Sequence, residues 1–236
     1  ATVRSLVQAA GAAVGFVQDP DADRLAIIDE TGRYIGEELT LGLAVELRYS
    51  QAQGPLVLNL STSRVSEEIA RKHGCPVWRV PVGEAHVVAR MLEESALLGG
   101  EGNGGVIDPR VGYVRDSFVA MALVLDLMVQ RRQPLSRLAA ELPRYGMVKR
   151  RHDLPDSAQG VSSLLEEIAA QFPDAQIDRR DGLRLEWPEG WVHARASNTE
   201  PIVRVIAEAA SIEQANRLAD RVAPWFTIPP RGEPSS

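Results

Sequence analysis

Short apolar segments alternate with amphipathic segments along residues 25–132, and this alternation restricts the possible folds more than any other feature of the sequence. Residues 55–60 form a compact apolar run that is typical of a buried strand. Residues 85–94 instead carry apolar side chains at the spacing of an amphipathic helix. Strands that alternate with helices usually form a sheet covered by those helices, so we expect an α/β architecture in this region.

The pattern changes after Pro134 and Pro143, which enclose a short helical segment. The elements expected before this change are a hairpin at 25–35, helices at 39–48, 63–74, 85–94 and 117–132, and strands at 55–60 and 77–80. After it the sequence predicts a strand at 146–153, a helix at 162–172 and several short strands. The predicted fold class is therefore α/β, with mixed-sheet α/β domains followed by a C-terminal α+β domain.

Charge and apolar content exclude two kinds of partner. The formal net charge of −6 argues against a general nucleic-acid binder, which needs a basic face to neutralise phosphates. The longest apolar run, residues 118–129, contains Asp126 and is shorter than the roughly 20 residues that span a bilayer. The single cysteine, Cys75, cannot form an internal disulfide. We therefore expect no nucleic acid and no membrane among the partners, and a cytoplasmic location.

Three carboxylates stand at alternate positions in the run Asp-Pro-Asp-Ala-Asp-Arg. Asp19, Asp21 and Asp23 could converge on one hard cation, because Mg²⁺ and Ca²⁺ prefer oxygen ligands. A solvated acidic turn is one alternative. An EF-hand calcium loop is another, since Glu30 is twelfth when Asp19 is first, but Arg24 stands where that loop requires glycine. A hairpin is also expected where the EF-hand helix should follow, so we predict a magnesium site open to a phosphate.

A glycine-rich segment covers residues 99–105 and reads Gly-Gly-Glu-Gly-Asn-Gly-Gly. Glycine allows the backbone to approach a ligand closely, and Glu101 and Asn103 can form hydrogen bonds with hydroxyl groups. Neighbouring sugar hydroxyls would suit this pair. A flexible linker is the alternative for a segment of this composition, and the segment by itself leaves both interpretations open.

A polar segment near the C-terminus begins at Arg195 and reads Arg-Ala-Ser-Asn-Thr-Glu-Pro. Its side chains include those of Ser197, Asn198 and Thr199. A guanidinium, two hydroxyls, an amide and several backbone N–H groups match a phosphate, which accepts many hydrogen bonds. Arg204, on the strand expected next, could add positive charge. An ordinary turn between strands is the alternative.

In this order, the three segments resemble those of the α-D-phosphohexomutase superfamily. The run at 19–24 is similar to its magnesium loop, in which three aspartates bind the cation and the arginine lies beside a phosphoserine, which implies a catalytic role for Arg24. The run at 100–105 resembles its sugar-binding loop, and the run at 195–201 its phosphate-gripping loop. The resemblance implies Mg²⁺ as the cofactor and a phosphorylated hexose or hexosamine as the partner.

The superfamily has four domains, and the change of pattern near residue 140 resembles the join between the third and the fourth. By this resemblance, residues 1–52 are the C-terminal part of the second domain, 53–138 the third, 139–228 the α+β phosphate-binding domain and 229–236 a disordered tail. The first domain, with a serine loop resembling Thr-Ala-Ser-His-Asn-Pro, has no counterpart in this sequence. We therefore expect a fragment without the catalytic serine, whose natural partner is the missing N-terminal domain of the same protein.

The resemblance implies an isomerase that interconverts hexose 6-phosphate and hexose 1-phosphate through a phosphoserine enzyme and a bisphosphate intermediate. Asn103 with the glycines that follow it, together with residues 197–201, most resembles phosphoglucosamine mutases; phosphomannomutase and phosphoglucomutase are the alternatives. His86 falls where the superfamily has another substrate-contacting loop, and could contact ligand or face solvent. Two other classes stay open, a non-catalytic phosphosugar-binding protein and a magnesium-dependent phosphatase.

Overall fold

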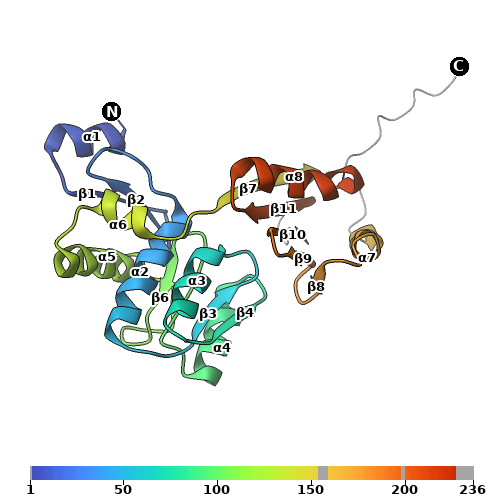
Figure 1. Ribbon diagram of the computed structural model, residues 1–236, viewed down its shortest axis with the longest axis horizontal. Coiled ribbons are helices and arrows are strands. Elements are labelled where there is room, and N and C mark those ends of the chain that lie inside the picture. The colour runs from blue at the N-terminus through green and yellow to red at the C-terminus, as the bar shows by residue number, and fades with distance from the viewer. Residues whose placement is uncertain (1, 154–158, 198–199, 227–236) are drawn as a thin grey trace, which may run out of the picture. The chain divides into compact units, whose positions relative to one another are not determined.

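The computed structural model describes residues 2–153, 159–197 and 200–226. The chain divides into two compact units, Ala1–Arg144 and Tyr145–Ser236 (Figure 1). The first unit combines helices with a mixed sheet, and the second packs helices against an antiparallel sheet, which confirms the predicted fold class. No helix in the described ranges is both long and apolar enough to cross a membrane. The finer division of the first unit near residue 52 stays a prediction.

The first unit contains a two-stranded sheet and a four-stranded sheet. In the smaller sheet, β1 (Val14–Gln18) pairs antiparallel with β2 (Leu25–Asp29). The larger sheet has the order β4-β3-β5-β6, formed by β3 (Leu56–Asn59), β4 (Val77–Val80), β5 (Leu98–Glu101) and β6 (Gly105–Ile107). β3 is parallel to β4 and to β5, whereas β6 is antiparallel to β5. The hairpin expected at 25–35 is only partly present, as an isolated bridge between Ile28 and Tyr34.

Three helices of the first unit pack against one central helix, α2 (Glu37–Gln51). They are α3 (Arg64–Lys72), α5 (Ser117–Arg131) and α6 (Leu135–Glu141), and the unit also contains α1 (Val3–Ala10) and α4 (Glu84–Glu94). Figure 1 shows α2 between α3 and α5, and α2 also contacts β2, β5 and β6. Because α2 is enclosed on most sides, most of its buried positions are apolar or small, with Arg48 as the charged exception. A Cβ on Gly42 would lie 3.0 Å from Val65 of α3.

A buried ion pair links α2 to the segment that follows β6. Arg48 is 5% exposed and Asp108 is 2% exposed, and 3.3 Å separates Nε of Arg48 from a carboxylate oxygen of Asp108. Asp108 also accepts a hydrogen bond of 2.7 Å from Nη2 of Arg110. Burial lowers the pKa of Arg48, and the negative charge of the nearby Asp108 partly offsets this lowering. The pair therefore fixes the start of the loop between β6 and α5.

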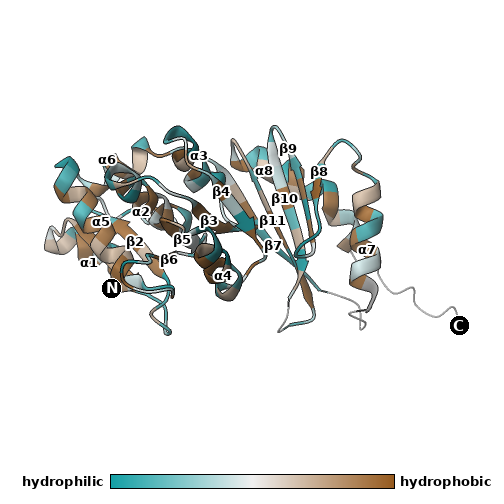
Figure 2. Ribbon diagram, turned by 90° about the horizontal axis from the view of Figure 1, so that it is seen from below, coloured by the Kyte–Doolittle hydropathy of each residue, from teal (hydrophilic) through white to brown (hydrophobic). Residues whose placement is uncertain are grey.

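The second unit is an antiparallel sheet with its core on one face. The strand order is β7-β11-β10-β9-β8, formed by β7 (Gly146–Asp153), β8 (Gln176–Asp178), β9 (Leu183–Trp187), β10 (Gly190–Ala196) and β11 (Ile202–Ala209), and Figure 2 shows the strands side by side. The helices are α7 (Gln159–Ala170), α8 (Ile212–Val222) and a 3₁₀ helix at Ala223–Phe226. Alternate residues of β11, among them Val203 and Val205, join Leu218 of α8 in the core.

Replacing Asp108 by alanine should lower the free energy of unfolding by about 3 kcal/mol, because it leaves the buried guanidinium of Arg48 without its carboxylate. Urea unfolding followed by circular dichroism measures this change. As a control, Glu93→Ala removes an exposed partner of Arg90 and should cost less than about 0.5 kcal/mol. Equal losses in the two variants would contradict a special role for the buried pair.

Candidate functional site

The predicted magnesium loop forms the turn between β1 and β2, and Asp19 holds this turn in shape. Its Oδ1 accepts hydrogen bonds of 3.2 Å from the backbone N–H groups of Asp23 and Arg24. Its Oδ2 accepts a hydrogen bond of 2.8 Å from Nε of Arg24. Ala22 adopts a left-handed conformation with φ of 56°, so the chain reverses tightly at this point. The aspartates are therefore presented on a turn that is braced by one of them.

Two of the aspartates in this turn influence each other's ionisation. Burial raises the pKa of Asp23; Arg115 opposes this effect, and the neighbouring carboxylate of Asp19 raises the pKa further. Burial also acts to raise the pKa of Asp19, but hydrogen bonds from Arg24 and Asp23 hold it below its ordinary value. Carboxylates that repel each other at short range are stabilised by a cation. Asp21 lies on the same turn and is exposed.

The turn fits Mg²⁺ in its chemistry, since it offers only oxygen ligands. Asp19 and Asp23 already lie close together, and their carboxylates are engaged by Arg24 and Arg115. In the described part of the chain, no three His, Cys, Asp or Glu side chains are grouped so that they could hold a metal ion. Binding at Asp19, Asp21 and Asp23 would therefore require Asp19 and Asp23 to exchange their guanidinium partners for the cation.

A pocket of about 240 Å³ brings the first two predicted loops together. Asp19 and Arg24 of the turn line it together with Asn103 of the glycine-rich loop. The two loops are joined by the backbone, because the N–H of Leu25 donates a hydrogen bond of 3.2 Å to the carbonyl of Gly104. Gly104 has φ of +88°, and a Cβ there would collide with the backbone of Leu25, so glycine is required for this approach.

Glu101, predicted to contact sugar hydroxyls, ends β5 and is only 2% exposed. Its Oε1 accepts hydrogen bonds of 2.7 Å from Nδ2 of Asn59 and 3.0 Å from the N–H of Gly83. Its Oε2 accepts a hydrogen bond of 2.5 Å from Nη1 of Arg115. Asn103 is half-buried and lines the pocket itself. The structure thus places Asn103 at the pocket, whereas the buried Glu101 is not among the residues that line it. Both sugar contacts stay predictions.

Arg115 is a site residue that the sequence analysis missed. It lies just before α5 and forms ion pairs with Asp23, with Glu84 at 3.0 Å and with Glu101 at 2.5 Å. These acids belong to the turn after β1, the start of α4 and the end of β5. A Cβ on Gly105 would lie 2.5 Å from Cδ of Arg115, so the small residue leaves the space through which the guanidinium reaches its partners. The only sequence signal is a basic residue among several acidic loops.

His86, the remaining candidate of the first unit, lies in the first turn of α4 and is exposed. It is absent from the residues that line the pocket. Glu84, two residues earlier, links α4 to the site instead. Its Oε2 accepts hydrogen bonds of 3.0 Å from the backbone N–H and from Nε of Arg115.

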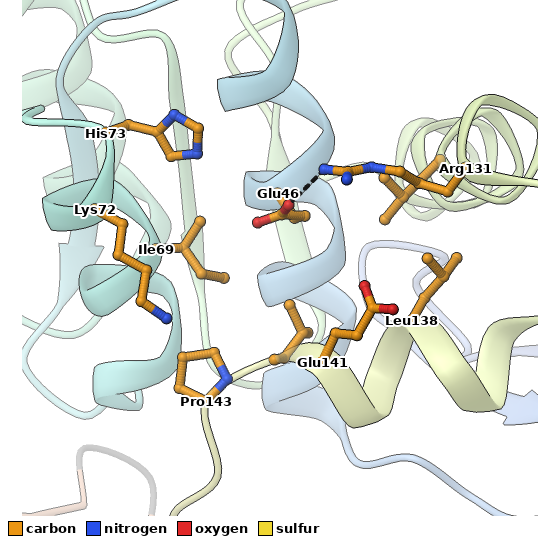
Figure 3. Close-up of a pocket in the computed structure, with 10 residues that line it drawn as sticks. Glu46, Ile69, Lys72, His73, Arg131, Leu138, Glu141 and Pro143 are labelled. Atoms are coloured by element: carbon orange, nitrogen blue, oxygen red, sulfur yellow. Dashed lines mark hydrogen bonds and ion pairs between the residues drawn. The ribbon is translucent and has the colours of Figure 1, made fainter. Parts of the chain in front are cut away.

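A second pocket of the first unit, of about 260 Å³, lies among α2, α3, α5 and α6 (Figure 3). Its lining includes acidic and basic groups in similar number, and the sequence-predicted site residues lie elsewhere. Figure 3 shows Glu46 pointing toward Arg131, with which it forms an ion pair of 2.8 Å. Lys72 pairs with Glu68 at 3.5 Å. With its charges balanced in this way, the pocket offers no excess positive charge to an anionic ligand.

The predicted phosphate loop lies in the second unit, where arginines stand in a row across three strands. Arg195 of β10 is directly opposite Arg204 of β11, and Arg204 is directly opposite Arg151 of β7. Glu200 lies 3.2 Å from Arg204 and 3.0 Å from Arg151. Like charges in directly opposite positions are destabilising, so this row favours an anion beside it.

The loop after β10 is described only in part. The N–H of Ser197 donates a hydrogen bond of 2.9 Å to the carbonyl of Ile202, which closes the loop between β10 and β11. Asn198 and Thr199, both predicted to bind phosphate, lie outside the described residues. The predicted metal and sugar loops therefore belong to the first unit, and the predicted phosphate loop belongs to the second.

Two residues before Arg195, β10 carries the fully buried side chain of His193. Its Nε2 lies 2.6 Å from the backbone carbonyl of Asp181 and donates to it in the neutral form. Burial lowers the pKa of His193 to about 4; the bond to Asp181 acts in the opposite direction, and the charge of Arg184 lowers the pKa further. The folded second unit therefore holds a neutral histidine at neutral pH.

Comparison with known proteins agrees with this arrangement. The family model described as "Phosphoglucomutase/phosphomannomutase, alpha/beta/alpha domain III" matches residues 36–145. The model of the C-terminal domain of the same family matches residues 153–224. Together the two matches cover most of the sequence. The chain therefore belongs to the phosphoglucomutase/phosphomannomutase family, within the α-D-phosphohexomutase superfamily.

Individual relatives agree with this assignment. A probable phosphoglucosamine mutase of Methanopyrus kandleri is 36% identical over 216 residues, which cover 91% of this chain and 48% of that protein. A phosphoglucomutase/phosphomannomutase of Thermococcus kodakarensis is also 36% identical, over 91% of this chain and 47% of that protein. A crystal structure of a family member from Burkholderia thailandensis superposes with a TM-score of 0.80 at 28% identity, over 94% and 48% of the two chains. The chain spans about half the length of these relatives.

Replacing Arg115 by methionine should lower the free energy of unfolding by about 3 kcal/mol, because it leaves the buried carboxylate of Glu101 without its cation. Adding Glu101→Gln should recover about 1 kcal/mol, since the uncompensated charge is then gone. Urea unfolding of the single and double variants measures both effects. Arg71→Met is the control and should have little effect, because Arg71 is exposed and its partner Glu67 keeps an ion pair with Arg79. Strictly additive losses would contradict the coupling.

His193 should make folding depend on pH between about 6.5 and 4. The unfolded chain binds a proton at His193 below its ordinary pKa of 6.5, whereas the folded chain does so only near 4. The contribution is thus complete above pH 6.5 and is lost as the pH falls, by about 3 kcal/mol in total. Urea unfolding at several pH values should show a smaller pH dependence in His193→Gln, whose amide N–H can still reach the carbonyl of Asp181. Identical pH profiles would contradict this role.

Proposed function

We propose that this chain forms the metal-, sugar- and phosphate-binding part of a magnesium-dependent phosphohexomutase. This reaction interconverts hexose 6-phosphate and hexose 1-phosphate through a phosphoserine enzyme and a bisphosphate intermediate. The observation that carries the proposal is that the predicted metal loop and the predicted sugar loop line the same pocket, the first with Asp19 and Arg24 and the second with Asn103. The relatives named above support the same activity, and the phosphoserine would come from a region like the half of those relatives that this chain does not span.

In this proposal, Asp19, Asp21 and Asp23 hold Mg²⁺, which when bound supplies positive charge that stabilises the transferring phosphoryl group. Phosphoryl transfer needs mainly positioning and electrostatic stabilisation, which a bound cation and a nearby arginine would supply. Arg24 lies at the pocket, with its side chain 46% exposed and its Nε bonded to Asp19. We assign it the task of stabilising phosphoryl charge beside the metal, which is the catalytic role proposed for this chain.

Residues away from the reacting phosphoryl group would orient the sugar. Asn103 and Glu101 are assigned to the sugar hydroxyls, with Asn103 at the pocket surface. Arg195, Ser197, Asn198, Thr199 and Arg204 are assigned to the phosphate that does not react. Binding energy from that remote phosphate would orient the substrate and lower the barrier for the transfer.

The substrate proposed for the whole protein is a glucosamine phosphate. The Methanopyrus relative is named a probable phosphoglucosamine mutase, which supports this choice. The Thermococcus relative, of equal identity, is named for glucose and mannose phosphates, which are therefore the alternative substrates. In the glycine-rich loop, Asn103 lines the pocket, so it is the side chain we expect to discriminate among these sugars.

Binding measurements on this chain test the assignments. In the presence of Mg²⁺, Arg195→Ala should weaken glucosamine 6-phosphate, glucose 6-phosphate and mannose 6-phosphate alike, by about tenfold or more, because it removes a charge-assisted bond to the shared phosphate. Asn103→Ala should instead change the ranking of the three sugars. Titration calorimetry measures both. Arg179→Ala, which removes an exposed arginine paired with Glu166, is the control and should bind like the unaltered chain.

The outcomes separate the possible functions. Unchanged affinity in Arg195→Ala would contradict the phosphate assignment, and an unchanged sugar ranking in Asn103→Ala would contradict the sugar assignment. Catalysis is tested on the complete gene product with a mutase assay. Phosphosugar binding without turnover in that assay would indicate a non-catalytic phosphosugar-binding protein and would contradict the mutase proposal.

A further inference from the structure

Arg195 is held by a carboxylate that lies outside the predicted phosphate loop. Its Nε is 3.1 Å from Oδ2 and 3.3 Å from Oδ1 of Asp181. Asp181 belongs to the turn between β8 and β9, and β9 is the neighbour of β10 in the sheet. Both side chains are mostly buried, with 15% of the Arg195 side chain and 20% of the Asp181 side chain exposed. The pair is therefore better shielded from solvent than an ordinary surface ion pair.

The backbone of this turn is fixed against β10 at the same point. Gly182 has φ of +73°, and a Cβ there would lie 2.9 Å from Cα of Arg195 and would collide with the carbonyl of Ala194. The carbonyl of Asp181 accepts the hydrogen bond of 2.6 Å from the buried Nε2 of His193. Asp181 is thus anchored through its backbone while its carboxylate holds Arg195, so the carboxylate has little freedom to move.

The atom that Asp181 engages matters for phosphate binding. A guanidinium carries donors on Nε and on two Nη nitrogens in a rigid plane, and it grips phosphate best with two parallel N–H groups. A carboxylate that holds Nε fixes the orientation of this plane and leaves the Nη nitrogens as the atoms for a phosphate. A side chain fixed before binding loses less conformational freedom on binding, which raises affinity.

We propose that Asp181 is a positioning residue that orients Arg195 for binding the phosphate group of a sugar phosphate. The inference rests on the proposed function, since it takes Arg195 as a phosphate ligand. A neighbouring ion pair provides a comparison: Asp178, the last residue of β8, lies with its Oδ2 2.5 Å from Nη2 of Arg180. Asp178 has no such bond to Arg195, so removing it changes the turn's charge without releasing the guanidinium.

The test uses this chain with two probes, inorganic phosphate and glucosamine 6-phosphate, titrated by calorimetry. The proteins are the unaltered chain, Asp181→Ala, Asp181→Asn, Arg195→Ala, the double variant Asp181→Ala/Arg195→Ala and the control Asp178→Ala. Asp181→Ala should weaken both probes by about tenfold, the effect expected when a charge-assisted bond is lost. The double variant should bind no more weakly than Arg195→Ala, and Asp178→Ala should bind like the unaltered chain.

Whether anion affinity falls or rises in Asp181→Ala distinguishes a positioning role of Asp181 from a purely electrostatic effect of its charge. Removing a negative charge beside an anion site strengthens anion binding unless the charge also orients a ligand. A second readout is the NMR signal of the Arg195 Nε–H group, whose hydrogen bond should be lost in Asp181→Ala and partly kept in Asp181→Asn. The backbone amide spectrum shows whether each variant is folded. Should Asp181→Ala fail to fold, Asp181→Asn takes its place in both measurements, with a smaller loss expected.

Three results would overturn the inference. Phosphate affinity that is unchanged or stronger in the folded Asp181 variants would show that Arg195 needs no orientation. Additive losses in the double variant would show that Asp181 acts independently of Arg195. Unchanged affinity in Arg195→Ala would remove the phosphate role of Arg195, and the proposed function of this loop would fall together with the inference.

Discussion

The site of the first unit depends on Arg115, which forms ion pairs with Asp23, Glu84 and Glu101. Three acidic groups from separate segments would repel one another without a shared cation. One of them, Glu101, is buried, so an unpaired charge there would be costly. Arg115 therefore holds three segments together: the turn after β1, the start of α4 and the end of β5.

Close backbone approach completes the arrangement around the pocket. Gly104 touches the backbone of Leu25, and Gly105 leaves room for Arg115, so the glycine-rich loop is a packed element rather than a flexible linker. In the second unit, Asp181 and His193 do the equivalent work at Arg195. In the second unit, the predicted phosphate ligand Arg195 is held in place before any ligand binds, which favours binding. In the first unit, the carboxylates of Asp19 and Asp23 must first exchange guanidinium partners for the cation.

Contiguous features were predictable from the sequence, whereas contacts between distant segments were not. Ser63 indicated the start of a helix, and it caps α3 by accepting a hydrogen bond from the N–H of Val65. The expected hairpin at 25–35 was only partly right, because a local pattern cannot reveal that β2 pairs along its length with β1. The burial of Glu101 and the role of Arg115 depend on the folded sheet, so motifs alone could not identify them.

Diffraction from crystals of this chain grown with Mn²⁺ and glucosamine 6-phosphate would test the central claim most directly, because Mn²⁺ can replace Mg²⁺ at oxygen ligands and scatters anomalously. The account predicts an anomalous peak within coordination distance of Asp19, Asp21 and Asp23, with sugar density in the pocket beside Asn103. A metal bound elsewhere, or a turn that keeps its guanidinium partners and an empty pocket at saturating ligand, would contradict it.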